Sequence, residues 1–271
     1  MALTELQKDI VRCLASNRSE TSYMAGGLVL NHEWPRISDD VDIFHDTDEE
    51  IGAAADKDIE TLRDAGYRVS VEVEIYGCVE ATVSKDGQST VIQWMSETKT
   101  RFFPLVRDEE WGSRLHQADL AINKVIAASS RTKPRDFVDL VTIDKRWCPL
   151  GPLVLAAAGK PPQFSPQKII DEIRRRGMSV GNEGYDSVKG LPNEWNASLV
   201  RDMLDAALEA AEVYILKVPI DAVGLLSVDG NGTPVEVSSM DDAGVVFRKA
   251  TEEPEVMPTL DDAPREWKPG W

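Results

Sequence analysis

The sequence predicts an α/β (α+β) protein in which a mixed sheet flanked by helices comes first and a mostly helical part follows. Between positions 67 and 95, apolar and polar residues alternate, which is typical of half-buried strands. From position 117 onward, apolar residues recur at helical spacing instead. The chain has 271 residues, of which 42% are hydrophobic, and this is enough apolar material for a sizeable core.

The change of pattern divides the chain into three predicted parts. Residues 1–107 are expected to form an α/β domain, and residues 108–250 a mostly helical domain. Residues 251–271 contain four prolines and many charges, so we expect an acidic, mobile tail.

The first part begins with an amphipathic helix, because Leu6, Ile10 and Leu14 recur on one helical face. Gly66 is expected to end a second helix, and the turn Lys85-Asp86-Gly87-Gln88 to join two strands. The expected elements, in order, are a helix at 3–15, a short strand at 41–44, a helix at 48–65, a strand at 67–76, a hairpin of 79–84 and 90–95, and a short strand at 102–106.

The second part is expected to be helical at 117–129, 134–147, 165–177 and 195–213, with an apolar segment at 151–158. Pro134 suits the first turn of its helix. A small hairpin is predicted at 221–237, around the turn residues Asp229-Gly230-Asn231-Gly232.

The charge of the chain limits its partners. Its 47 acidic and 30 basic residues give a formal net charge of -17, which repels nucleic acid at long range, so an RNA contact needs a local basic patch. Arg174, Arg175 and Arg176 form the one basic triplet. It is either an RNA-phosphate contact or a helix end with solvated arginines.

The expected location is the cytoplasm, without membrane association. The three cysteines form no CxxC pair, which argues against a disulfide framework or a zinc site. No apolar run approaches the roughly 18 to 20 residues of a membrane helix, and the N-terminus lacks the pattern of a signal peptide.

Asp40 and Asp42 are the first candidate site residues. In a strand their side chains share one face, while Val41 and Ile43 point into the core. Two carboxylates this close repel each other unless a cation lies between them, and hard oxygen ligands suit Mg²⁺ or Mn²⁺. A solvated turn is the alternative interpretation of the pair.

Four residues before the pair extend the candidate site. Gly26 and Gly27 can let a phosphate approach the backbone, or they form a tight turn or a close packing contact. Arg36 offers a guanidinium fork for phosphate oxygens, and Ser38 offers a hydroxyl beside a metal and a triphosphate. Their alternatives are a surface arginine and a turn serine.

The glycine pair followed by Arg-x-Ser-x-Asp-x-Asp-hydrophobic-Phe resembles the polymerase-beta-like nucleotidyltransferase superfamily. More narrowly, the segment RISDDVDIF (residues 36–44) is similar to the AbiEii/AbiGii toxin branch. A second block agrees: DLAINKVIAA (residues 119–128), Arg131 and KPRDFVDL (residues 133–140) are similar to the downstream helices of that branch. Together the two blocks cover roughly residues 20–145, about half of the chain.

In that branch a lysine on one helix and an Arg-Asp-x-x-Asp segment on the next close the nucleotide site. The resemblance therefore assigns Lys124, Arg135, Asp136 and Asp139 to nucleotide binding or catalysis, with residues 108–250 completing the site of the first domain. Lys124 can place a point charge on a phosphate. Asp136 and Asp139 share a helical face and can orient a cation, act as a base, or form a surface ion-pair cluster.

One position departs from the superfamily, which usually has a third carboxylate on a later strand. The strand TVIQWM (residues 90–95) is similar to that strand, and the matching position holds Gln93, which is neutral and a poor base. Glu72, Glu74 or Glu80 on neighbouring strands, or Asp136 or Asp139, are candidates to replace it.

The resemblance implies a nucleotidyltransferase that uses Mg²⁺ (or Mn²⁺) and an NTP and transfers NMP to an RNA (tRNA) or protein hydroxyl. It also implies a toxin-like or phage-defence-like role with a cognate antitoxin or defence-complex partner. Two alternatives stay open: a catalytically degenerate nucleotide-binding subunit, which Gln93 favours, and a small-molecule nucleotidyltransferase of the antibiotic-modifying type.

Overall fold

The computed structural model describes residues 3–258, which divide into two compact units. Among the described residues, the first unit consists of residues 3–99 and 104–120, and the second of residues 100–103 and 121–258. Residues 259–271, most of the predicted tail, lie outside the described residues. The domain boundaries expected from the sequence stay predictions.

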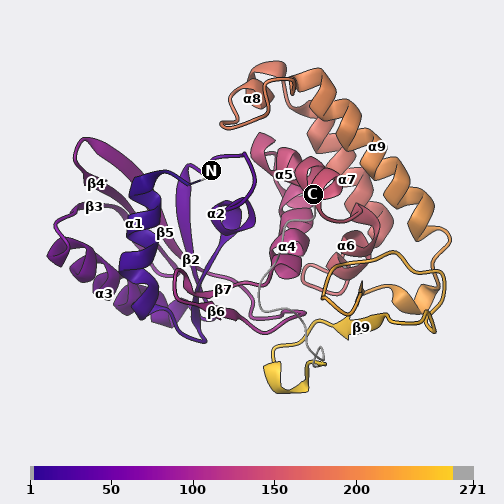
Figure 1. The fold of residues 1–271 in the computed structure, drawn as a ribbon, viewed down its shortest axis with the longest axis horizontal. Helices are drawn as coiled ribbons and strands as arrows, with labels where there is room; N and C mark the ends of the chain where they lie inside the picture. The colour runs from indigo at the N-terminus through magenta and orange to yellow at the C-terminus, as the bar shows by residue number, and fades with distance from the viewer. Residues whose placement is uncertain (1–2, 259–271) are drawn as a thin grey trace. The chain divides into compact units, whose positions relative to one another are not determined.

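A seven-stranded mixed sheet forms the first unit, with strand order β3-β4-β5-β2-β1-β7-β6 (Figure 1). The strands are β1 (Ser22–Ala25), β2 (Asp40–His45), β3 (Arg68–Ile75), β4 (Cys78–Lys85), β5 (Gln88–Ser96), β6 (Val106–Asp108) and β7 (Gly112–Arg114). Two neighbouring pairs are parallel, β2 with β5 and β1 with β7, and the others are antiparallel. The predicted mixed sheet flanked by helices is therefore confirmed.

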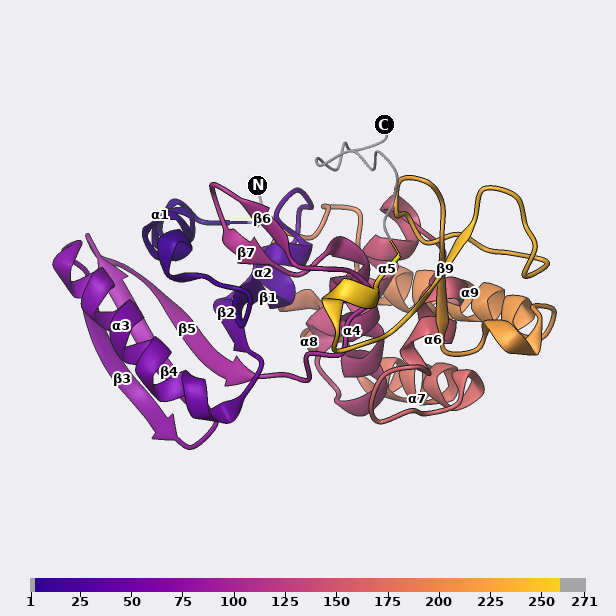
Figure 2. The same cartoon turned by 90° about the horizontal axis from the view of Figure 1, so that it is seen from below.

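Helices α1 (Glu5–Leu14) and α3 (Ile51–Asp64) cover one face of β4 and β5 (Figure 2). Alternate residues of the strands point to this face and are fully buried, including Val41, Ile43, Ala81, Ile92 and Trp94. The other alternate residues of β4 and β5 are half-exposed on the opposite face, which is called the open face below. Because the side-chain period is two, the register of these strands decides which residues reach the open face.

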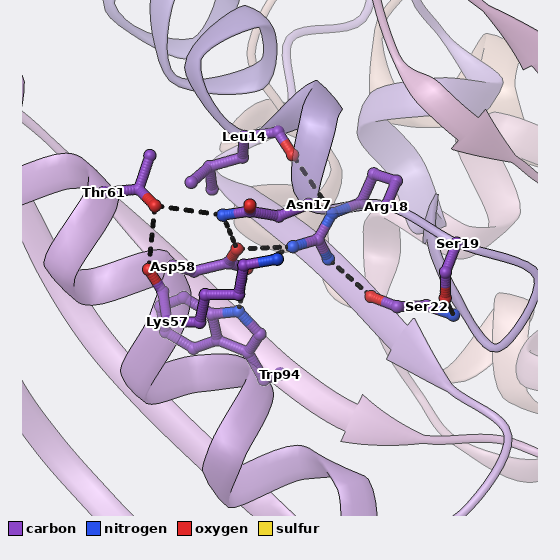
Figure 3. A network of polar contacts seen from close by, with 9 residues as sticks. All are labelled: Leu14, Asn17, Arg18, Ser19, Ser22, Lys57, Asp58, Thr61 and Trp94. Carbon is purple, nitrogen blue, oxygen red and sulfur yellow. Dashed lines mark hydrogen bonds and ion pairs between the residues drawn. The ribbon is translucent and has the colours of Figure 1, made fainter.

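A buried polar network ties the covered face together (Figure 3). Asp58 on α3 accepts hydrogen bonds from Arg18 Nη2, from Asn17 Nδ2 at 2.9 Å and from Trp94 Nε1 at 2.8 Å. Arg18 also donates to Ser22 Oγ at 2.8 Å. The network joins the segment after α1 to β1, α3 and β5, so a buried charge pair holds the elements of this unit in register.

The second unit is mostly helical, as predicted. Its helices are the C-terminal part of α4 (Gln117–Ser130), α5 (Pro134–Arg146), α6 (Leu150–Ala157), α7 (Pro166–Ser179), α8 (Asn182–Asp186) and α9 (Ala197–Ile215). The long helix α9 packs against α5, α6, α7 and α8. Among residues 3–258, no helix combines the length and the apolar character needed to cross a membrane.

The small β-element of the second unit differs in detail from the predicted hairpin. Strand β8 (Leu225–Val228) pairs with β9 (Val246–Lys249) in an antiparallel register. The turn at 229–232 does reverse the chain, but it adds only an isolated bridge between Val228 and Pro234. The partner of β8 is therefore supplied by residues 246–249, which begin nine residues after the end of the predicted hairpin at 237.

The short strand predicted at 102–106 is misplaced. Phe102 and Phe103 are buried. Arg248 contacts both, because its Nε donates to Phe102 O at 2.6 Å and its Cζ lies 3.9 Å from the centre of the Phe103 ring. The strand of this region, β6, begins only at Val106 and pairs with β7, for which no strand was expected. Apolar residues at 102–103 thus serve packing and not strand pairing.

Candidate functional site

The two aspartates lie on the open face of β2. Val41, between the two aspartates, and Ile43, directly after them, are fully buried on the covered face, as the alternation predicted. Asp40 is 9% exposed, and Asp42 is half-buried. Strand β2 runs between β1 and β5, so both carboxylates stand in the interior of the sheet and not at its edge.

Gly26 and Asp42 meet because of the register between β1 and β2. Ala25 at the end of β1 is paired with Asp42, and Gly26 begins α2 (Gly26–Leu30) directly after it. A Cβ built on Gly26 would lie 1.8 Å from Asp42 Oδ2, and the φ of Gly26 is +71°. Two independent constraints, space and backbone conformation, therefore require glycine here.

Gly27 provides room for two of the other predicted site residues. A Cβ on Gly27 would lie 2.2 Å from Arg36 Nη2 and 3.2 Å from Ser38 Oγ. Arg36 and Ser38 are each 2% exposed, and Arg36 Nη1 donates to the carbonyl of Ile37 at 3.1 Å. The space beside Gly27 is thus used by the guanidinium and the hydroxyl of this chain.

Ser38 connects this segment to the first aspartate, since its Oγ donates to Asp40 Oδ1 at 3.1 Å. The backbone around it is held by two residues that sequence reasoning missed. Gln7 Nε2 on α1 donates to Ser38 O at 2.9 Å, and Thr90 Oγ1 on β5 donates to Asp39 O at 3.3 Å. The only local signal for Gln7 is its place in a capping box with Thr4, which says nothing of a contact 31 positions away.

The structure brings six of the predicted site residues together in the first unit: Gly26, Gly27, Arg36, Ser38, Asp40 and Asp42. The oxygen donors of this group are two carboxylates and a hydroxyl, a set that fits a hard cation such as Mg²⁺ or Mn²⁺. Among residues 3–258, no group of three or more His, Cys, Asp and Glu residues is placed to hold a metal ion. Asp40 and Asp42 are thus the two acidic groups that the structure offers to a cation at this place.

Gln93 stands directly beside Asp42 on the neighbouring strand. The two residues are partners in the parallel register of β2 and β5, and Gln93 is in turn paired with Glu80 on β4. Gln93 Nε2 donates a hydrogen bond to Glu80 Oε2. Asp42, Gln93 and Glu80 thus form a row across three neighbouring strands of the open face.

The other predicted site residues lie in the second unit, where three of them form a buried ion-pair cluster. Lys124 Nζ on α4 lies 2.9 Å from Asp136 Oδ1 and 3.1 Å from Asp139 Oδ2, both on α5. Both aspartates are fully buried, and Lys124 is 7% exposed. Arg135 is half-buried on the same helix.

Arg131 completes this cluster and is missing from the predicted site. Its Nε lies 2.8 Å from Asp136 Oδ2, and its Nη2 donates to Asp136 Oδ1 at 3.2 Å. Burial raises the pKa of Asp136, but Lys124 and Arg131 outweigh it and lower this pKa to about 2. Asp136 is therefore ionised at neutral pH and is a weak base.

The basic triplet of α7 is neutralised by acidic neighbours. Arg174 lies 3.2 Å from Asp205 and 2.9 Å from Glu212 on α9. Arg175 and Arg176 lie 2.6 Å and 3.0 Å from Glu172. These contacts correspond to the interpretation as a solvated helix end, because each arginine already has a carboxylate partner.

Comparisons with known proteins add the fold family. The sequence matches no protein-family model, and it matches no curated protein. The structure is similar to that of MenT4, nucleotidyltransferase toxin Rv2826c from Mycobacterium tuberculosis H37Rv. The TM-score is 0.53 and the sequence identity 13%, over 80% of this chain and 84% of that chain.

Two further likenesses are weaker and carry no argument. A proposed nucleotidyltransferase from H. pylori has a TM-score of 0.44 and 15% identity, over 77% of this chain and 94% of that chain. Cid1, with RNA terminal uridylyl transferase activity, has a TM-score of 0.29 and 10% identity, over 76% of this chain and 65% of that chain. At the identity of MenT4 the likeness concerns the fold alone: this chain has a nucleotidyltransferase-type fold.

Proposed function

We propose that the protein is a metal-dependent nucleotidyltransferase that transfers NMP from an NTP to a hydroxyl of an RNA, such as a tRNA, or of a protein. The observation that carries the proposal is the pair Asp40 and Asp42 on the open face of β2, with Gly26 leaving space for the Asp42 carboxylate. The nucleotidyltransferase-type fold around this pair supports it. The resemblance of residues 36–44 to the AbiEii/AbiGii branch, and the likeness to a toxin, favour a toxin-like role.

Asp40 and Asp42 would hold Mg²⁺ or Mn²⁺, which offsets negative charge on the triphosphate and on the departing pyrophosphate. Ser38 orients the Asp40 carboxylate through its hydroxyl, because Oγ donates to Oδ1. Arg36 places a positive charge beside the same segment, and the absence of a side chain at Gly27 leaves the space that its guanidinium occupies. Ser38 thus acts before any chemistry by fixing the Asp40 carboxylate in one orientation.

Lys124 is proposed to bind a phosphate oxygen of the nucleotide. An ammonium group has three donors, and Asp136 and Asp139 occupy two of them, which leaves one for a ligand. Asp136 acts as a positioning residue in this proposal and not as the base, because its pKa of about 2 is far below the value of an effective base at neutral pH.

A catalytically degenerate nucleotide-binding subunit is the second candidate, because Gln93 stands where the superfamily usually has a carboxylate. The two candidates differ in whether label moves from the nucleotide to an acceptor. An RNA acceptor must overcome the net charge of -17 without help from the arginine triplet, whose members are all paired with acids. A protein acceptor or a basic protein partner faces no such barrier.

The test is to incubate the purified chain with Mg²⁺, each of four α-labelled NTPs, and either total tRNA or a protein extract. Label transfer is expected with the wild type and is expected to fall at least 100-fold in Asp40→Asn and Asp42→Asn, because each removes one negative ligand. Asp39→Asn is the matched control, since Asp39 is exposed next to the pair. Transfer by the two site variants at the rate of the control contradicts the proposal, and nucleotide binding without transfer supports the degenerate candidate.

A further inference from the structure

We propose that Gln93 supplies the third protein ligand of the metal site through its amide oxygen, and that Glu80 is a positioning residue that holds this amide in the required orientation. The inference rests on the proposed function, because it assumes that Asp40 and Asp42 hold a divalent cation. Gln93, which departs from the carboxylate usual at this position, thereby becomes a metal ligand. Glu80, one of several candidates to replace that carboxylate, supports Gln93 instead.

The sheet register limits which side chains can reach the cation. Neighbouring strands lie roughly 5 Å apart, so Gln93 on β5 stands one spacing from Asp42, and Glu80 on β4 stands two spacings away, at roughly 10 Å. The side chains of such a row stand nearly parallel above the sheet. Gln93 and Asp42 can therefore bind the same cation, whereas Glu80 is separated from Asp42 by the whole of β5.

The hydrogen bond between the two residues decides how the glutamine is oriented. Glu80 is a carboxylate and only accepts, so it must receive the amide N–H₂ of Gln93. The carbonyl oxygen of the same planar amide is then at the end away from Glu80, and within residues 3–258 it accepts no hydrogen bond. An amide oxygen is a hard, neutral ligand that suits Mg²⁺ and Mn²⁺.

The arrangement also explains how the site could work with only two acidic ligands. No third acidic residue joins Asp40 and Asp42 within the described part of the chain. The negative charge that the third carboxylate would contribute is instead one strand further out, on Glu80, where it interacts with the cation through the Gln93 amide. Residues behind a metal ligand typically change metal affinity about 10- to 100-fold when they are replaced.

Mn²⁺ binding tests the proposal without any turnover. The free Mn²⁺ signal in electron paramagnetic resonance, measured during titration of Mn²⁺ into the full-length protein, reports the dissociation constant of each variant. Glu80→Gln and Gln93→Ala are each expected to weaken binding about 10-fold or more. Glu74→Gln is the matched control, because Glu74 on β3 is exposed and is paired with Val79, whose side chain points to the covered face.

An exchanged variant, Gln93→Glu combined with Glu80→Gln, keeps the hydrogen bond with its polarity reversed and keeps the total charge. It is expected to bind Mn²⁺ at least as tightly as the wild type, because position 93 then offers a carboxylate oxygen. If Glu80 only stabilised the fold, Glu80→Gln would change the free energy of unfolding and leave the Mn²⁺ affinity of the folded protein unchanged. A loss as large as that of Glu80→Gln alone overturns the proposal.

The remaining outcomes separate this inference from the proposed function. If Asp42→Asn weakens Mn²⁺ binding but Glu80→Gln and Gln93→Ala do not, the metal site stands and the roles of Gln93 and Glu80 are wrong. If Glu80→Gln weakens binding and Gln93→Ala does not, Glu80 acts without Gln93 and the inference is overturned. If neither Asp40→Asn nor Asp42→Asn changes the affinity, the proposed metal site itself fails.

Discussion

Gly26 and Asp42 occupy adjoining space so closely that a Cβ on Gly26 would lie 1.8 Å from Asp42 Oδ2. No rotamer of an alanine methyl group relieves such a contact, because the Cβ position is set by the backbone. The carboxylate must therefore move whenever position 26 carries a side chain. This relationship makes the glycine a direct determinant of where the second aspartate stands.

The substitution Gly26→Ala is expected to weaken Mn²⁺ binding and label transfer at least 10-fold, because the Asp42 carboxylate is displaced. It also costs about 1–2 kcal/mol of stability, since the φ of residue 26 is +71°. Titration of Mn²⁺ and urea-induced unfolding measure the two effects separately.

Gly66→Ala is the matched control for this change. Its φ is +85°, so the backbone cost is similar, but no atom lies within 4 Å of the added Cβ. The control is expected to lose stability and to keep its Mn²⁺ affinity. Equal loss of affinity in both variants would mean that the effect of Gly26→Ala is only a general loss of stability.

Ser38→Ala is expected to lower Mn²⁺ affinity about 10-fold, because the hydrogen bond from Oγ to Asp40 Oδ1 no longer orients that carboxylate. Ser38→Thr keeps a hydroxyl and is expected to recover most of the affinity. The same titration measures both variants. An unchanged affinity in Ser38→Ala would show that Asp40 needs no support from this hydroxyl.

Asp58→Asn is expected to destabilise the protein by about 3–5 kcal/mol, because the buried Arg18 guanidinium loses its counter-charge. Combining Asp58→Asn with Arg18→Met removes the orphaned charge, so the double variant is expected to be more stable than the single one. Urea unfolding followed by circular dichroism compares the two. A double variant that is less stable than Asp58→Asn contradicts this account of the network.

The protein is expected to become less stable as the pH is lowered, because of His45. Its side chain is 1% exposed, and burial, followed by the nearby charge of Arg18, lowers its pKa to about 4, while Asp58 acts in the opposite direction. The unfolded chain takes up a proton near pH 6.5, and the folded one does so only near pH 4. The native state therefore loses stability as the pH falls through this window, by roughly 2 kcal/mol at pH 5.

His45→Gln removes this titration and serves as the comparison. The difference in unfolding free energy between the wild type and His45→Gln is expected to shift by roughly 2 kcal/mol between pH 7 and pH 5, to the disadvantage of the wild type. Because both proteins contain the same other titratable groups, the pH dependence that those groups cause cancels in the difference. A difference that stays constant between these pH values would show that His45 is not held neutral by the fold.

Local patterns predicted most of the fold. The helices α4 and α5 begin and end within one residue of the segments expected from apolar periodicity and from Pro134 at a first turn. The alternation of Asp40 and Asp42 with Val41 and Ile43 likewise follows from the period of a strand. These features depend only on residues that are close in sequence.

Pairings between distant segments escaped prediction. The strand that completes the second sheet, β9, is separated from β8 by a turn that by itself looked sufficient for a hairpin. The contact of Gln7 with Ser38 depends on how α1 packs against the sheet, which no local periodicity contains. The contact of Gln93 with Glu80, by contrast, follows from the predicted hairpin, because a turn at 85–88 pairs position 80 with position 93. The role of Arg131 as second cation on Asp136 was missed although the two residues are close in sequence, because it depends on how the chain turns between α4 and α5.

Two successive residues of β5 take part in two different parts of the molecule, the candidate site and the core. Gln93 faces Glu80 on the open side, and Trp94 reaches Asp58 on the covered side. An insertion or deletion of one residue inside β5 would exchange these faces, turning an indole outward and an amide into the core. Evolution can therefore alter the side chains of this strand one at a time, but it cannot alter the strand's length without losing the core and the site in the same event.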